Sequence, residues 1–278
     1  MCSPSRLICM VLHLGGTMLE IKALTKTYSN GYAAVDNLTI SVFPGDIYGF
    51  IGSNGSGKTS TIKSIVGIHD FDGEILVNGK MVNENKSDYK KDIAYIPDNP
   101  DIYENLTGIQ YINFIEDLYE VPLAERELAV TYLSELFEMK SFLNNVILSY
   151  SHGMKQKLVI IAALVHSPKL LIMDEPFVGL DPKSAYLLKE EMKKLSNNGN
   201  AIFFSTHVLE VAEKLCNRIA MIDKGQLVFE GETKEISACN WALCAFSSVL
   251  LGASPPLRAR RYCSSSSLPS ATNWPRTK

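Results

Sequence analysis

The feature that most constrains the fold of this 278-residue chain is a glycine-rich loop, GSNGSGKTS, at residues 52–60. A strand-like run, DIYGFI, precedes the loop, and a helical pattern, TIKSIVGI, follows it. The loop fits the phosphate-binding spacing G-x-x-x-x-G-K-[ST] through Gly52, Gly57, Lys58 and Thr59. Glycines let backbone N–H groups close around an anion, and the helix that follows adds the positive end of its dipole. The loop therefore predicts a nucleotide site, which a kinase, a GTPase or a motor could use equally well.

Every residue of this loop is a candidate nucleotide contact: Gly52, Ser53, Asn54, Gly55, Ser56, Gly57, Lys58, Thr59 and Ser60. We expect Lys58 to reach the β- and γ-phosphates and the Thr59 hydroxyl to bind Mg²⁺. The alternative is a Gly/Ser turn that fits the pattern by chance. The strand before the loop and the helix after it argue against that alternative.

The order of the remaining elements predicts an α/β fold. LEIKAL and LTISVF have the pattern of short strands, and EILVNGKMV that of a hairpin that turns at Asn78-Gly79. A long helical block from about Thr107 to His166 precedes strand LLIMD, helix SAYLLKEEMKKL, strand AIFFS, helix VLEVAEKLC and a second hairpin. Alternating strands and helices favour a largely parallel sheet covered on both faces. The helical block is too long for one crossover, so we expect an inserted helical subdomain.

Charge and hydropathy exclude several classes of protein. Six of the 27 basic residues and none of the 30 acidic ones lie outside 18–238. Residues 18–238 therefore contain 21 basic and 30 acidic residues, a net charge of −9. A nucleic-acid binder normally has a basic surplus, so we expect no nucleic-acid partner. The longest apolar run, Ala242 to Ala253, is too short for a membrane span of roughly 20 residues. Cys216 is the one cysteine in 18–238, which favours a reducing compartment.

The two ends of the chain differ in composition from the part between them. Residues 239–278 contain SSSS, PP and RARR with no helix or strand period, so we interpret them as a disordered or out-of-frame tail. A regulatory basic tail is the alternative. Residues 1–17 are interpreted as a non-native leader before a start at Met18, and a secretory signal in LICMVLHL is the competing interpretation.

A second chemical site is predicted where KLLIMDEP ends a buried strand. Asp174 would lie at the C-terminal end of that strand, where an open α/β sheet binds its ligands. This carboxylate can hold the Mg²⁺ that Thr59 also contacts. Glu175 can orient or deprotonate the attacking water, which favours hydrolysis over transfer to a second substrate.

The segment LSYSHGMKQK decides between families. Taken alone, it is an ordinary helix start with Ser151 as the N-cap. With the phosphate loop upstream and DEP downstream, the chain resembles the ATP-binding cassette (ABC) family, whose signature LSGGQ lies just before the DE-containing strand. The resemblance covers 18–238. It implies an α/β P-loop NTPase fold with a mostly parallel core sheet, an N-terminal antiparallel β subdomain and an inserted α-helical subdomain at about 99–166.

The resemblance also implies roles for single residues. Tyr28 matches the aromatic residue that stacks on adenine, with Tyr32 as its rival, and Ser151 and Gly153 match the groups that hold phosphate. His207 matches the switch histidine beside the γ-phosphate, so the implied catalytic set is Glu175, His207 and Lys58. The segment GLDP, residues 179–182, matches the D-loop.

Three positions depart from the family pattern. Asp98 stands where a glutamine is usual, and we group it with Thr59 and Asp174 as a metal ligand. His152 and Met154 replace a glycine and a glutamine of the signature. Similar substitutions occur among bacterial export-type ABC ATPases, such as the Ecs and daunorubicin-resistance-like groups, so we expect activity to be retained.

The resemblance therefore implies an ATP hydrolase with ATP and Mg²⁺ as cofactors, acting as a dimer with a second ABC subunit. It would power an ABC membrane transporter, an exporter, from the cytoplasmic face of the membrane as a peripheral subunit. A transmembrane permease would dock near Asp98–Leu118, where Ile102, Tyr103 and Leu106 are candidate contacts or subdomain core. The alternative is a soluble ABC ATPase outside transport. A P-loop kinase is disfavoured by Glu175, Ser151-Gly153 and His207 together.

Overall fold

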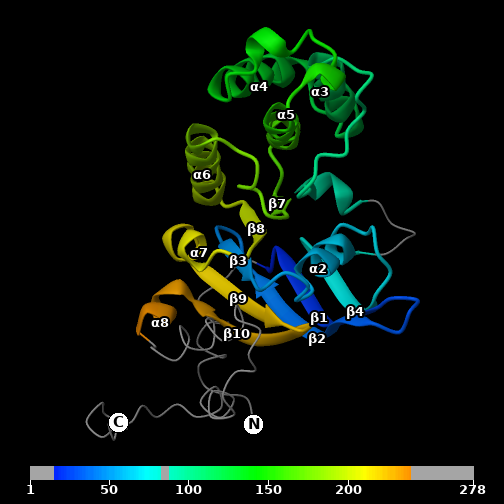
Figure 1. Cartoon of the computed structure of the whole chain (residues 1–278), viewed down its shortest axis with the longest axis vertical. Helices are drawn as coiled ribbons and strands as arrows, with labels where there is room; N and C mark the ends of the chain where they lie inside the picture. Colours follow the sequence, from blue (N-terminus) through cyan, green and yellow to red (C-terminus); the bar gives the residue numbers. More distant parts are fainter. Residues whose placement is uncertain (1–15, 83–87, 239–278) are drawn as a thin grey trace, which may run out of the picture. The chain divides into compact units, whose positions relative to one another are not determined.

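The computed structural model describes residues 16–82 and 88–238, which form two β-sheets and the helices around them (Figure 1). Residues 14–235 make one compact unit. The proposed tail at 239–278 and all of the proposed leader except residues 16 and 17 lie outside the described residues.

The first sheet is antiparallel, with the strand order β2-β1-β4-β5. Its strands are β1 (Leu19–Thr27), β2 (Ala33–Val42), β4 (Asp72–Val77) and β5 (Lys80–Met81). The β4–β5 turn is the predicted one, because Asn78 and Gly79 both have positive φ, 49° and 74°. This is the geometry that a tight hairpin turn requires. The expected N-terminal antiparallel subdomain is therefore present.

The second sheet is mostly parallel, with the strand order β10-β9-β3-β8-β7-β6. Its strands are β3 (Ile47–Ile51), β6 (Ile93–Ile96), β7 (Leu170–Met173), β8 (Ala201–Thr206), β9 (Arg218–Asp223) and β10 (Gln226–Glu232). Neighbours from β9 to β6 are parallel, and only β10 pairs antiparallel. All residues of β3, β7 and β8 are buried, which explains their unbroken apolar runs.

One strand of this sheet is absent from the sequence-based prediction. β6 has only four residues, IAYI, between the short 3₁₀ turn Lys90–Asp92 and Pro97. So short an apolar run carries no usable period. It is a strand because it pairs in register with β7, from Ile93 beside Leu170 to Ile96 beside Met173.

The helices fall into two groups. The inserted helical subdomain consists of α3 (Gly108–Leu118), α4 (Leu123–Leu136) and α5 (His152–Val165), and both α3 and α4 pack against α5 (Figure 1). The others are α2 (Lys58–Ile65), α6 (Pro182–Asn197), α7 (Leu209–Leu215) and α8 (Thr233–Ala238). No helix in the described ranges is both long and apolar enough to cross a membrane.

Side-chain caps determine where three helices begin. Thr107 and Gln110 form a reciprocal capping box at α3. Ser151 accepts a hydrogen bond from Met154 N at α5, and Asp181 accepts one from Ser184 N at α6. The last two caps therefore determine where α5 begins within the signature segment and where α6 begins within the GLDP loop.

Candidate functional site

The glycine-rich loop connects the end of β3 at Ile51 to the first residue of α2, Lys58. Gly55 and Gly57 have φ values of 78° and 110°, which only glycine adopts without strain. A Cβ on Gly52 would collide with Ser56 Oγ and with Ile222 O, and a Cβ on Gly57 with Ala34 O. The loop is therefore tightly folded against its surroundings, and its backbone N–H groups lie at the N-terminus of a helix, the geometry that binds phosphate.

The Lys58 side chain lies along the inside of this loop. It is only 6% exposed, and its Nζ donates to the carbonyl oxygens of Gly52 and Ser53 at 2.8 and 3.2 Å. Ser56 Oγ is buried without a hydrogen-bond partner. Thr59 is exposed in the first turn of α2. The loop thus holds the Lys58 ammonium group together with the Ser56 hydroxyl, which has no hydrogen-bond partner among the described residues.

A pair of acidic residues follows β7. Asp174 is 1% exposed and accepts a hydrogen bond from Ser205 Oγ at 2.6 Å. The same Ser205 oxygen accepts a hydrogen bond from the backbone N–H of Glu175 at 3.0 Å. Glu175 has a positive φ of 46°, an uncommon conformation for a non-glycine residue. Ser205, from β8, therefore holds both acidic residues in place.

Ser205 was missed in the sequence analysis. The available signal was a hydroxyl residue in the otherwise apolar strand AIFF, two positions before His207. A buried hydroxyl needs a hydrogen-bond partner, so such a residue indicates polar groups on the neighbouring strand.

Two groups from other elements approach one oxygen of Glu175. Lys58 Nζ lies 3.5 Å from Oε1, and His207 Nδ1 lies 3.0 Å from the same atom. This oxygen is buried and accepts no well-aligned hydrogen bond. The three catalytic candidates of the sequence analysis thus meet at one point, although they come from α2, the end of β7 and the end of β8.

Asp98 also lies within electrostatic reach of these acidic residues. Partial burial raises the pKa of Asp98, and the negative charges of Asp174 and Glu175 raise it further. The pKa of Tyr95 is raised by burial and by Asp174 and Asp98. Negative charges gathered in this way favour a bound cation.

The oxygen donors at this site suit a hard cation such as Mg²⁺. They are the carboxylates of Asp174 and Asp98, the donor type that Mg²⁺ prefers, while the third predicted ligand, Thr59, is exposed in the first turn of α2. Within 16–82 and 88–238, no three His, Cys, Asp or Glu side chains form a metal cage. Mg²⁺ does not need one, because it is usually bound by one or two carboxylates together with substrate phosphates.

The signature segment is attached to the GLDP loop. The His152 ring lies against Gly179, so that a Cβ on Gly179 would come within 3.0 Å of Nε2. Lys157 Nζ pairs with Asp181 at 2.9 Å. By contrast, no hydrogen bond or ion pair in the described part of the chain joins Ser151 or Gly153 to residues 52–60. Among the described residues, Ser151 and Gly153 therefore share no direct polar contact with the phosphate loop of the same chain.

Two tyrosines border the phosphate loop. Tyr28 OH is hydrogen-bonded to Ser60 Oγ at 3.0 Å, and Tyr32 OH donates to Gly55 O at 3.3 Å. Their rings are nearly parallel, at 13°, with centroids 6.5 Å apart. Both aromatic candidates of the sequence analysis therefore lie beside the loop.

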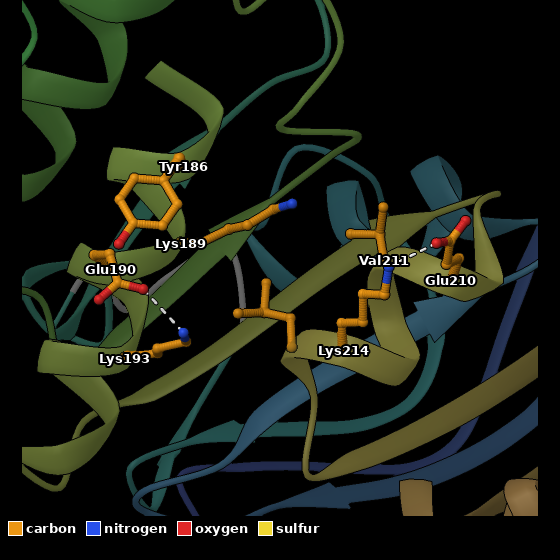
Figure 2. Close-up of a pocket in the computed structure, with 8 residues that line it drawn as sticks. Tyr186, Lys189, Glu190, Lys193, Glu210, Val211 and Lys214 are labelled. Atoms are coloured by element: carbon orange, nitrogen blue, oxygen red, sulfur yellow. Dashed lines mark hydrogen bonds and ion pairs between the residues drawn. The ribbon is translucent and has the colours of Figure 1, made fainter. Parts of the chain in front are cut away.

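A separate groove lies between α6 and α7 (Figure 2). Its lining is mostly charged and comprises Tyr186, Lys189, Glu190, Lys193, Glu210, Val211, Lys214 and Leu215. Lys193 pairs with Glu190 at 2.9 Å and Lys214 with Glu210 at 2.6 Å. The groove contains none of the nucleotide-binding candidates, and most of its charge is balanced internally.

Comparisons with known proteins agree with this geometry. A family model described as ABC transporter matches residues 35–178. The chain is 34% identical over 221 residues to the ABC-type transporter ATP-binding protein EcsA of Bacillus subtilis, covering 79% of this chain and 89% of that protein. It is 30% identical over 220 residues to the Nod factor export ATP-binding protein I of Cupriavidus metallidurans, covering 79% and 72%. A solved ATP-binding subunit of an ABC transporter superposes with a TM-score of 0.79 at 32% identity, covering 84% and 100%.

Proposed function

Because this chain belongs to the ABC transporter family and is an ATP-binding, ATP-hydrolysing subunit, we propose that it powers export through a separate transmembrane permease. The main support for the proposed hydrolysis site is that Lys58 and His207 both approach one oxygen of Glu175. The direction of transport is supported by a relative whose name states export.

In this proposal, residues 52–60 bind the phosphates of ATP through backbone N–H groups and the Lys58 ammonium. Lys58 Nζ donates to two loop carbonyls and lies 3.5 Å from Glu175 Oε1, so the ammonium group is already at the mouth of the loop where it would meet the β- and γ-phosphates. Tyr28 packs against the base. Its hydroxyl bond to Ser60 fixes the ring relative to the start of α2.

Thr59 and Asp174 would hold Mg²⁺, with Asp98 close enough to contribute. When bound, Mg²⁺ neutralises charge on the β- and γ-phosphate oxygens. Ser205 contributes by keeping the buried Asp174 carboxylate in one orientation. The raised pKa of Asp98 fits a group that a cation would stabilise in its charged form.

Glu175 is proposed as the group that orients the attacking water. As the water oxygen bonds to the γ-phosphorus, its proton passes to the Glu175 carboxylate and the bond to the leaving diphosphate oxygen breaks. The constrained backbone of Glu175 and its N–H bond to Ser205 limit where this carboxylate can lie. His207, whose Nδ1 lies 3.0 Å from Glu175 Oε1, would position the carboxylate and contact the γ-phosphate.

Ser151 and Gly153 complete the site from a second ABC subunit. The family resemblance implies this arrangement, and the lack of a direct hydrogen bond to the phosphate loop of their own chain, within the described residues, is compatible with it. Their position at the N-terminus of α5 provides a hydroxyl and free N–H groups for phosphate. ATP would then hold the dimer together, and hydrolysis would release it.

The permease is proposed to dock on the surface formed around residues 98–118. Tyr103 is 62% exposed, and its ring meets the exposed Phe114 edge to face at 5.7 Å. Leu118 is 60% exposed on the same helix as Phe114. Ile102 and Leu106 are partly buried and would contribute less. The chain would thus be peripheral at the cytoplasmic face of the membrane, and nucleic acid is not a proposed partner.

A site-specific cross-linking experiment tests the transport proposal. A photoreactive residue at position 103 should cross-link an integral membrane protein with several apolar spans in cells. The same residue at position 123, an 81% exposed leucine on α4, serves as the matched control and should not. Cross-links from position 103 to ribosomal or DNA-bound proteins alone would favour a soluble ABC ATPase instead.

A further inference from the structure

We propose that Phe177 is a positioning residue for ATP hydrolysis. Its ring contacts Phe204 of β8 and Lys189 of α6, and these contacts hold the turn that carries Glu175. The inference rests on the role proposed above for Glu175. It adds a residue that acts through that carboxylate and not by contact with the nucleotide.

The backbone at Glu175 needs support from its surroundings. Its φ of 46° is a conformation that a non-glycine residue keeps only where its neighbours hold it there. Glu175 also begins a tight turn, which is closed by a hydrogen bond from Val178 N to Glu175 O at 3.1 Å. The direction of the Glu175 carboxylate therefore depends on how this turn is attached to the rest of the protein.

Two successive residues of β8 attach the turn to the sheet. Ser205 Oγ accepts the hydrogen bond from Glu175 N at 3.0 Å. The Phe177 ring meets the Phe204 ring nearly at right angles, at 85°, with centroids 5.9 Å apart. Successive side chains of a strand point to opposite faces of the sheet. The segment that carries Glu175 is thus held at the end of β8 from both faces.

A cation from α6 completes the support of the Phe177 ring. Lys189 Nζ lies 5.0 Å from the centroid of this ring, within the range of a cation–π contact. Among the described residues, no carboxylate pairs with Lys189, whereas its groove neighbour Lys193 is paired with Glu190 (Figure 2). The Lys189 ammonium group is thus directed to an aromatic ring and not to an acidic partner.

The position of Phe177 predicts an effect on turnover and not on nucleotide affinity. Within the described residues, no hydrogen bond or ring contact joins Phe177 to the phosphate loop at 52–60. Loss of the ring would free the turn and displace the Glu175 carboxylate. A misplacement of about 1 Å at a reacting group can cost about 10²-fold in rate.

The first test measures hydrolysis and ATP binding with the full chain. Phe177→Leu keeps an apolar side chain but no flat ring, and should lower kcat about tenfold. The dissociation constant for ATP, measured without Mg²⁺, should stay within about twofold of the wild-type value, because the phosphate loop is unchanged. Phe177→Tyr keeps the ring and should retain most of the turnover.

A double-mutant cycle separates positioning from a general effect on folding. Phe177→Leu is added to Glu175→Gln, and the residual rate is measured in a single turnover. If Phe177 acts through the Glu175 carboxylate, the second substitution should lower this residual rate by no more than about twofold. Residues that act as one unit show such non-additive losses.

Lys189→Met tests the second contact of the ring. Methionine keeps an unbranched side chain without the charge, so kcat should fall about two- to fivefold, the usual worth of an exposed cation–π contact. Lys193→Met, on the same helix, is the matched control and should hydrolyse ATP like the wild type. If Phe177→Leu does not fold, Lys189→Met takes its place in the cycle with Glu175→Gln.

Two results would overturn the proposal. One is a wild-type kcat in Phe177→Leu. The other is an equal fold-loss from Phe177→Leu with Glu175 present and with Glu175→Gln, which would mean that the ring acts independently of the carboxylate. Wild-type hydrolysis by Glu175→Gln would instead contradict the role proposed for Glu175 itself, a separate outcome.

Discussion

The ammonium group of Lys58 lies 3.5 Å from the carboxylate of Glu175, inside a site where the two side chains are only 6% and 15% exposed. Salt screens such a partly buried pair much less than a surface pair. Lys58 comes from the phosphate loop and Glu175 from the end of β7, so the contact joins the group proposed to bind phosphate to the group proposed to activate water. The proposed binding and hydrolysis steps are therefore coupled at one point.

Glu175→Gln should leave ATP binding intact and lower turnover by roughly 10²–10⁴-fold, because the amide cannot accept the proton from the attacking water. An ATP-bound dimer should also accumulate in Mg-ATP. Turnover and size-exclusion chromatography measure the two effects. Glu190→Gln, in the α6–α7 groove, is the matched control and should behave like the wild type. Near-normal hydrolysis by Glu175→Gln would remove this residue from the base role.

Ser205→Ala should lower both stability and turnover. The substitution removes the buried donor to Asp174 and the acceptor of the Glu175 N–H, and each unpaired buried group costs about 1–3 kcal/mol. A loss of this size corresponds to a fall of several degrees in Tm, roughly 2–4 °C per kcal/mol. Ser149→Ala, at an exposed hydroxyl, should shift Tm little. Equal Tm values for the two variants would contradict the proposed role of Ser205.

Lys58→Ala and Ser151→Ala should each abolish most ATP hydrolysis, whereas a mixture of the two variants should recover part of it. One site of a mixed dimer would combine an intact Lys58 from one subunit with an intact Ser151 from the other. ATPase assays on mixtures, with subunit exchange checked by differently sized tags, provide the measurement. Mixtures that stay inactive despite exchange would exclude a site shared between two chains.

Glu116→Gln should stabilise the protein more at high pH than at low pH. Glu116 is 1% exposed in α3, and burial raises its pKa although Arg126 opposes the shift. Because the folded state holds this proton more tightly than the unfolded state, the stability it contributes is present at low pH. That contribution is lost as pH rises through the raised pKa.

The measurement for this prediction is Tm from pH 4 to pH 8. The advantage of Glu116→Gln over the wild type should grow as the pH rises through the raised pKa of Glu116. Glu125→Gln, exposed in the first turn of α4, is the control and should show no such trend. An advantage independent of pH would mean that Glu116 does not titrate as described.

Much of the fold was predictable from local patterns. The apolar runs of β3, β7 and β8 indicated buried parallel strands, and Asn78-Gly79 indicated the hairpin turn that the structure contains. Such features depend on neighbours in the chain, through side-chain period, turn conformation and capping. β6 was missed because its four residues become a strand only through pairing with β7.

The sequence by itself determined the chemical groups of the site: a phosphate loop that only glycines can form, and acidic residues at the end of a buried strand. Only the tertiary structure decided that Ser205 holds both acidic residues and that His207 and Lys58 approach the same oxygen of Glu175. These contacts join strands and loops that are distant in the chain. Their distances depend on the register and twist of the parallel sheet, which the packing of the whole core determines and no local pattern encodes.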